Sequence, residues 1–199
     1  MARTSAIERR GQLIEAGLRV IAREGMHGAT VRAIVAEADV PLATFHYVFA
    51  SREEMIGEAY AYIAVQPDDS LAGLVPDGAA PEDAVRALLM HWLERFLQHP
   101  EYELAIMEIM AFCTRTPALA HLPAQVQEGY LELVVAAIEL LRERFEVSAA
   151  PGARDVATLL IHVTDGITYS WLRTRDSDAS RRMIDAAVPA LTAAVMGRG

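Results

Sequence analysis

Between Thr30 and Arg52 the sequence gathers side chains that can hydrogen-bond to phosphates and to base edges. Hydroxyl groups at Thr30, Thr44 and Tyr47 suit phosphate oxygens, and such contacts position a protein without reading sequence. The guanidinium of Arg32 could reach a guanine edge or a phosphate, or remain a solvated surface group. These residue types therefore predict contact with nucleic acid.

Five further side chains extend this candidate surface. Leu42 and Ala43 can contact thymine methyl groups, and His46 could bond a base or a phosphate, or simply be half-exposed. Arg52 is expected to contact phosphate from the start of the following helix. Arg3 is expected to touch phosphate or the minor groove, with a disordered tail as the alternative.

Two short helical patterns must position these residues. Thr30 is suited to cap the first pattern, whose apolar residues fall on one face at helical spacing. These residues are Val31, Ile34, Val35 and Ala38. The pattern stops at residues 39–41, because aspartate tolerates a left-handed turn and proline fits the first turn of a new helix.

The second pattern spans residues 42–47 and can bury Val40, Phe45 and Phe49 while its other side chains point outward. A capping box from Ser51 to Glu54 then begins a third helix. Two helices of this length and connection predict a helix-turn-helix, whose second helix can lie in a DNA major groove.

The same region resembles the N-terminal signature of the TetR family of bacterial transcriptional regulators, over about residues 5–60. The matching residues surround the turn and the capping box: Gly25, Gly28, Thr30, Ile34, Ala38-Asp39-Val40, Thr44-Phe45, Phe49 and Ser51-Arg52-Glu53-Glu54-Met55. Three positions differ from the usual pattern: Asp39 replaces a turn glycine, His46 a tyrosine, and Val48 a histidine or tyrosine. The resemblance implies a homodimeric, ligand-responsive regulator of transcription, and the departures affect the operator sequence and phosphate contacts.

The charge of the chain is divided unevenly. The net charge of the whole is −9, but residues 1–52 hold seven arginines against five acids, and residues 53–199 hold 11 arginines against 22 acids. The chain has no lysine, so every basic contact to phosphate must come from arginine. A positive end on an acidic body suits one DNA-facing surface.

The hydrophobic periodicity predicts an all-α fold of about nine helices without strands. The expected helices lie at 5–23, 30–38, 42–47, 51–66, 81–98, 101–114, 124–145, 153–174 and 178–196, with a loop rich in helix breakers from 67 to 78. We expect a helix-turn-helix DNA-binding domain at 1–52 and a helical effector-binding and dimerisation domain at 53–199. In the TetR family the last two helices pair with those of a second subunit, which implies a homodimer through 153–174 and 178–196.

The central helices carry an aromatic and methionine-rich set that could line a ligand cavity or form ordinary core. The predicted lining is His91, Trp92, Phe96, Met107, Met110, Cys113, Tyr130 and Trp171. Polar groups that could orient a ligand there are His91, Arg95, Glu108, Arg115, His162 and Asp165. With 22 acids in the body, a neutral or cationic, largely apolar ligand is expected.

Catalysis and metal binding find no support in the sequence. His162 and Asp165 are three residues apart, but no third ligand lies at a recognisable spacing, and no nucleophile elbow or phosphate-binding loop is present. No cofactor is therefore expected. With one cysteine, no signal sequence and no run of ~18 apolar residues, the chain is predicted to be cytoplasmic.

The sequence thus predicts a DNA-binding repressor released from a palindromic operator by a small ligand. A helical small-molecule-binding protein or enzyme with a vestigial DNA-binding head is the alternative.

Overall fold

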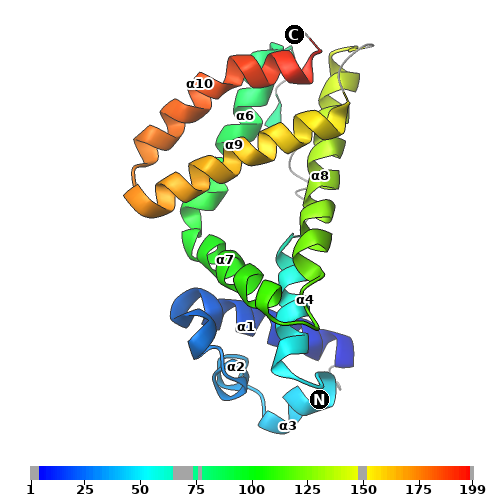
Figure 1. The fold of residues 1–199 in the computed structure, drawn as a ribbon, viewed down its shortest axis with the longest axis vertical. Coiled ribbons are helices and arrows are strands. Elements are labelled where there is room, and N and C mark those ends of the chain that lie inside the picture. Colours follow the sequence, from blue (N-terminus) through cyan, green and yellow to red (C-terminus); the bar gives the residue numbers. More distant parts are fainter. Residues whose placement is uncertain (1–4, 65–73, 76–77, 148–151, 198–199) are drawn as a thin grey trace. The chain divides into compact units, whose positions relative to one another are not determined.

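The computed structural model describes residues 5–64, 74–75, 78–147 and 152–197, and its regular structure there is entirely helical (Figure 1). Nine helices lie in this part of the chain. They are α1 (Ala6–Gly28), α2 (Val31–Glu37), α3 (Leu42–Val48), α4 (Arg52–Ala64), α6 (Pro81–Gln98), α7 (Pro100–Arg115), α8 (Leu122–Arg144), α9 (Ala153–Thr174) and α10 (Ser177–Val195). The expected all-α fold with an N-terminal helix-turn-helix is confirmed.

Most helix boundaries agree with the periodicity, and the deviations have local causes. Helices α6 and α9 have the predicted bounds. Helix α8 begins two residues earlier than predicted, because Pro123 fits within a first helical turn. Most of the expected loop at 67–78 lies outside the described residues.

The described helices form two compact units. The first combines residues 1–66 with 101–127, and the second combines residues 67–100 with 128–199. Helix α7 therefore belongs to the unit that holds α1–α4, while α8 contributes its first residues to one unit and the remainder to the other. The functional division at residue 52 stays a prediction, since compactness alone does not define function.

The first unit has a core built from α1, α2, α3, α4 and α7. Its largest fully buried side chains include Phe45, Phe49, Leu13, Met55 and Ile109. Helix α1 is strongly amphipathic, and its apolar stripe packs against α2, α3 and α4. This packing fixes the two short helices, which are too short to be stable alone.

Helix α1 begins with a complete capping box, in which the Glu8 N–H donates to Ser5 Oγ and the Ser5 N–H donates to the Glu8 carboxylate. Gly25 ends its regular part, with φ 71° and ψ 178°. The first helix is expected to end at residue 23, and its regular part does end near there, although helical structure resumes for three residues up to Gly28.

The second unit has its own core, in which α10 packs against α6 and α9. Fully buried residues such as Leu93, Ile138, Ile184 and Leu191 come from three helices, α6, α8 and α10. Arg142 is buried and donates to the Val195 carbonyl oxygen at 2.9 Å, which fastens α8 to the end of α10. Among the described helices, none is long and apolar enough to cross a membrane.

Candidate functional site

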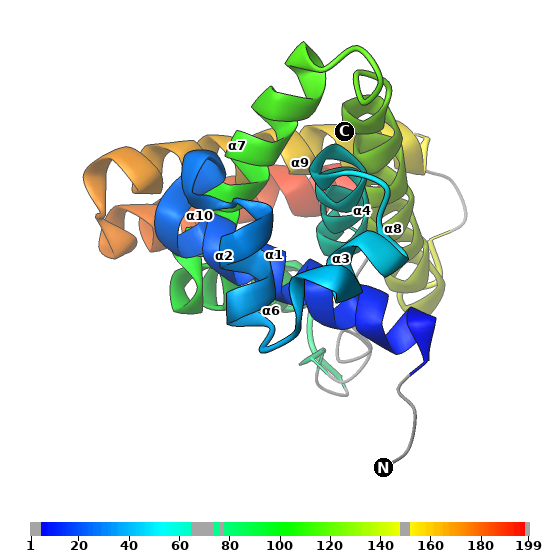
Figure 2. The ribbon, with the colours of Figure 1, turned by 90° about the horizontal axis from the view of Figure 1, so that it is seen from below.

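Helices α2 and α3 and the turn between them form the candidate DNA-binding surface (Figure 2). Thr30 caps α2 by accepting a hydrogen bond from the Ala33 N–H at 3.2 Å. Asp39 adopts the left-handed conformation with φ 51°, as the sequence predicted for the turn. Pro41 is the N-cap of α3, directly before the predicted start of that helix at Leu42.

Burial divides α3 into the two predicted faces. Phe45 and Phe49 are 0% and 2% exposed and lie against each other with ring centroids 5.4 Å apart. The Tyr47 side chain is 73% exposed and Leu42 is 43% exposed. The outward residues of α3 are Leu42, Ala43, His46 and Tyr47, with Thr44 half-buried beside them. Their roles toward DNA stay predictions.

Ser51 caps α4, since the Glu54 N–H donates to Ser51 Oγ at 3.0 Å. The Glu54 carboxylate accepts in return from the Ala50 N–H at 2.7 Å, and the Ser51 backbone also contributes a hydrogen bond to it. Glu54 also pairs with Arg10 of α1 at 2.6 Å. The Ala50 N–H, followed by Arg10, lowers the pKa of Glu54.

Arg10 was not singled out in the sequence, yet it fastens the end of α3 to α1 and α4. Its guanidinium donates to the Val48 carbonyl oxygen and to the carboxylates of Glu54 and Glu58, and it lies 4.3 Å from the centre of the Phe49 ring. Hydrogen bonding to Glu58 above all raises the pKa of Arg10. The spacing of Glu54 and Glu58, one helical turn apart, was the available signal.

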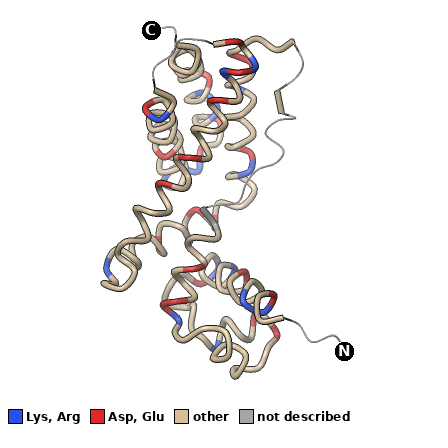
Figure 3. Tube along the Cα trace, turned by 90° about the vertical axis from the view of Figure 1, so that its right-hand side faces the viewer, with Lys and Arg blue, Asp and Glu red and all other residues tan. Residues whose placement is uncertain are grey.

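Most described arginines of the head, meaning α1–α4, are engaged within the chain. Arg19 and Arg23 both pair with Glu37, at 2.9 and 3.1 Å, and the Arg19 hydrogen bond contributes most to lowering the pKa of Glu37. Arg9 donates to the Gln12 side chain at 2.8 Å. Acidic and basic residues accordingly lie close to one another in this part of the chain (Figure 3).

Arg32 is exposed and makes no hydrogen bond or ion pair, unlike the other arginines that the structure describes in the head. It lies in the first turn of α2. It is thus the arginine best placed to meet DNA without breaking an internal contact. Arg3 lies outside the described residues.

Arg52 has an internal role that the sequence did not suggest. It donates to the Met26 and Ala29 carbonyl oxygens, at 2.5 Å each, and burial lowers its pKa. The contact of Arg52 with phosphate stays a prediction. Because Nε and Nη2 already donate to carbonyl oxygens, a phosphate would have to bind Nη1, or the side chain would have to rearrange.

The predicted pocket residues are divided between the two units. Met107, Met110 and Cys113 belong to the first, where Cys113 is fully buried in the core and Met110 is exposed. Burial raises the pKa of the Cys113 thiol. Glu108, proposed as a ligand-orienting group, accepts a hydrogen bond from the Met26 N–H.

The second unit brings together three of the predicted aromatic residues. Trp92 and Phe96 stack with centroids 6.1 Å apart, and Phe96 meets Trp171 edge-on at 5.0 Å. The Trp171 ring also carries the Arg175 guanidinium 4.5 Å from its centre. His91 and Tyr130 are half-buried in this unit. The lining as a whole stays a prediction.

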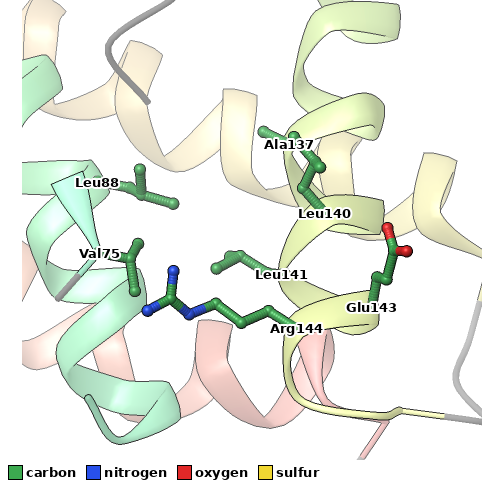
Figure 4. Close-up of a pocket in the computed structure, with 7 residues that line it drawn as sticks. All are labelled: Val75, Leu88, Ala137, Leu140, Leu141, Glu143 and Arg144. Carbon is green, nitrogen blue, oxygen red and sulfur yellow. The ribbon is translucent and has the colours of Figure 1, made fainter. Parts of the chain in front are cut away.

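A different groove of about 290 Å³ lies between α6 and the end of α8 in the second unit (Figure 4). Val75, Leu88 and Leu141 form its apolar wall, and the Arg144 side chain extends from α8 toward Val75. None of the eight residues predicted to line a pocket contributes to this groove. This groove could not be predicted from the sequence, because its lining residues come from three segments that are distant in the chain.

Residues 13–59 match the model of the family described as bacterial regulatory proteins, tetR family. Over 190 residues the chain is 30% identical to the nicotine-responsive transcriptional repressor HdnoR of Paenarthrobacter nicotinovorans, covering 92% of this chain and 96% of that one. The chain belongs to the TetR family. It is therefore a transcriptional regulator with a DNA-binding head.

Solved structures of other regulators share the fold. The fatty acid degradation regulator FadR of Bacillus halodurans has a TM-score of 0.70 at 17% identity, covering 94% of this chain and 96% of that one. FadR of Bacillus subtilis, solved with stearoyl-CoA, has a TM-score of 0.65 at 15% identity, covering 95% and 98%. At these identities the likeness concerns the fold alone.

TetR-family regulators bind DNA, typically as dimers and with small-molecule ligands. The relatives and the fold are those of regulators and not of enzymes. Among the described residues, no group of three histidine, cysteine or acidic side chains could hold a metal ion.

Proposed function

We propose that this TetR-family protein is a homodimeric repressor that inserts α3 into the major groove of a palindromic operator. The outward face of α3 carries this proposal, because Leu42, His46 and Tyr47 are exposed while Phe45 and Phe49 anchor the helix from behind. Arg32 adds an unengaged cation on α2. Thr30, Ala43 and Thr44 complete the predicted contact surface. Such a regulator is expected to act in the cytoplasm.

The proposed dimer forms through residues 153–174 and 178–196. Large apolar side chains on the outward faces of α9 and α10 support this assignment, since Leu159, Tyr169 and Met183 are 47%, 44% and 58% exposed. Gly166 lies on the same side of α9 and has open space above it, which allows a second helix to approach closely. Exposed apolar side chains gathered on one face support a contact with another protein surface there.

The operator follows from the symmetry of the proposed dimer. Two copies of α3 would meet major-groove faces about one helical turn apart (roughly 34–36 Å), so the operator should be an approximate inverted repeat. Selection of bound fragments from random DNA tests this directly. Recovery of a single asymmetric half-site, bound by one protomer, would overturn both the palindrome and the dimer.

The proposed effector is a small, largely apolar molecule that is neutral or cationic and releases the operator. The 22 acids against 11 arginines beyond residue 52 disfavour an anion. The relative HdnoR is described as nicotine-responsive, and nicotine is such a molecule.

Operator release can be measured by fluorescence anisotropy with nicotine and, in parallel, with stearoyl-CoA, the anionic ligand of the Bacillus subtilis relative. We expect release by nicotine or a related amine and none by stearoyl-CoA. The opposite pattern would refute the proposed effector class while leaving the repressor function intact.

A further inference from the structure

The short segment from Gly25 to Ala29 links the main part of α1 to the helix-turn-helix. Gly25 leaves the helical conformation, and Thr30 caps α2 directly after the segment. The position of this segment therefore decides where α2 begins. Both main-chain polar groups of Met26, in its middle, are held by side chains from other helices.

The Met26 N–H donates to the Glu108 carboxylate of α7 at 2.5 Å, across 82 residues of sequence. Gly25 makes room for that carboxylate, since a Cβ there would lie 3.1 Å from Glu108 Oε2. The φ of 71° at Gly25 also disfavours any other residue. Helix α7 is thus hydrogen-bonded to the main chain directly after the point where α1 is interrupted.

The Met26 carbonyl oxygen accepts from Arg52 Nη2, and Arg52 Nε donates to the Ala29 carbonyl oxygen. The guanidinium carbon of Arg52 lies 5.6 Å from the centre of the Phe112 ring. Phe112 follows Glu108 by four residues, so both side chains project from the same face of α7. We call Glu108, Phe112, Arg52 and Met26 the Met26 network.

The Met26 network joins α7 to the segment before α2 by hydrogen bonds with charged partners. Charged partners make these bonds stronger than neutral ones, and the carboxylate and guanidinium act on opposite ends of one residue. A shift of α7 along or about its axis would move Glu108 and Phe112 together. The Met26 main chain would then have to follow, or lose its partner.

We propose that Glu108 and Arg52 are positioning residues that couple α7 to the helix-turn-helix through the main chain of Met26. The consequence for DNA rests on the proposed function: an effector that displaces α7 would alter the start of α2 and with it the direction of α3. Glu108 is, in this account, a transmitting residue and not a ligand-orienting one.

Amide hydrogen exchange on the full-length protein, without DNA or ligand, tests the coupling. Glu108→Ala should speed exchange of the Met26 amide by roughly 10- to 100-fold, as expected for loss of a hydrogen bond to a charged group. Glu108→Gln keeps an acceptor oxygen and should give a smaller increase. Glu94→Ala, the same truncation at an exposed position of α6, is the matched control and should leave Met26 unchanged.

The distribution of the exchange changes along the chain distinguishes a local positioning role of Glu108 from a general loss of stability. Core amides of α1, such as those of Val20 and Ile21, should keep their wild-type exchange in Glu108→Gln. An equal increase at all amides, or no increase at Met26 in either variant, would overturn the proposal.

A second arm tests whether Arg52 and Glu108 act on the same element. The increase at Met26 in the double variant Glu108→Ala with Arg52→Met should fall clearly below the product of the two single increases. A multiplicative result would show independent action and refute coupling. Because neither arm uses DNA, failure to recover an operator would refute the proposed function and leave this result intact.

Discussion

The salt dependence of operator binding should be much shallower than the number of head arginines suggests. Residues 1–52 hold seven arginines, but Arg10, Arg19, Arg23 and Arg52 are bonded to carboxylates or carbonyl oxygens within the chain. An arginine beside a glutamate is locally neutral and displaces few counterions from DNA, and Arg52 keeps its charge but is directed into the chain by the Met26 and Ala29 carbonyl oxygens. Only the remaining arginines should count toward phosphate neutralisation.

The expected slope follows from counterion release, in which log K falls with log salt by about 0.9 per neutralised phosphate. Arg32 alone in both protomers gives a slope of about −2, and adding Arg3 and Arg9 gives about −5. All seven arginines of both protomers would give about −13. Between 50 and 200 mM salt, affinity should therefore fall about 10- to 2,000-fold.

Anisotropy titrations of a selected operator at four salt concentrations measure this slope, and Arg32→Ala separates two roles for that residue. If Arg32 contacts phosphate, the slope should become shallower by about 2. If it reads a guanine, the slope should change little, and the preferred sequence should change at a cost of about 1–3 kcal/mol per base contact. Arg19→Ala, which removes an arginine already paired with Glu37, is the control and should leave the slope unchanged.

A wild-type slope steeper than about −8 would refute this reasoning. It would mean that the internal ion pairs open on binding, which is conceivable energetically because exposed pairs contribute only about 0–1 kcal/mol. An Arg19→Ala slope shallower than that of the wild type would identify the Arg19–Glu37 pair as one that opens.

Three further perturbations test the head and the dimer. Phe45→Ala should lower stability by about 3–5 kcal/mol in thermal unfolding, because the side chain is fully buried, whereas Tyr47→Ala should change it by less than about 0.5 kcal/mol while weakening DNA binding. The pKa of Glu54 is lower in the folded chain than in the unfolded one, so its stabilisation is present above about pH 4.3 and is lost as pH falls through the folded value; Glu54→Gln should flatten the decline of Tm in that range. Leu159→Glu should yield monomers in sedimentation experiments, and Leu140→Glu, at a leucine of α8 that is 59% exposed against 47% for Leu159, should not; dimeric Leu159→Glu would move the interface elsewhere.

The head could be predicted closely because its signals are local. Helical spacing, a cap at Thr30 and a left-handed aspartate at position 39 each specify a few neighbouring residues, and all agree on one arrangement. The helical period alone predicts that Phe45 and Phe49 are buried on one face while Tyr47 is exposed on the other. The fold was thus readable from segments shorter than ten residues.

The partners of charged side chains could not be read in this way. Arg52 was assigned to phosphate, but it holds carbonyl oxygens that precede it by 23 and 26 residues. Glu108 is predicted as a ligand-orienting group, and its partner in the structure is the Met26 N–H, 82 residues away in the sequence. Such contacts depend on how whole helices pack, and periodicity carries no information about them.

The same limit applies to the pocket. A set of aromatic and methionine residues on amphipathic helices is compatible with a cavity or with a filled core. Cys113 lies in the core of the first unit, and Trp92, Phe96 and Trp171 fill space in the second by packing on one another. Residue type predicts burial here, but only packing determines whether space remains.

The turn between α2 and α3 has a consequence for the duration of promoter silencing. Asp39 holds a left-handed conformation that asparagine and glycine adopt as readily, so the backbone does not require its carboxylate. With α3 in the major groove, that charge would stand beside phosphates and shorten the residence time on DNA. Asp39→Asn would keep the turn, lengthen residence on every operator, and delay the return of transcription after the effector arrives.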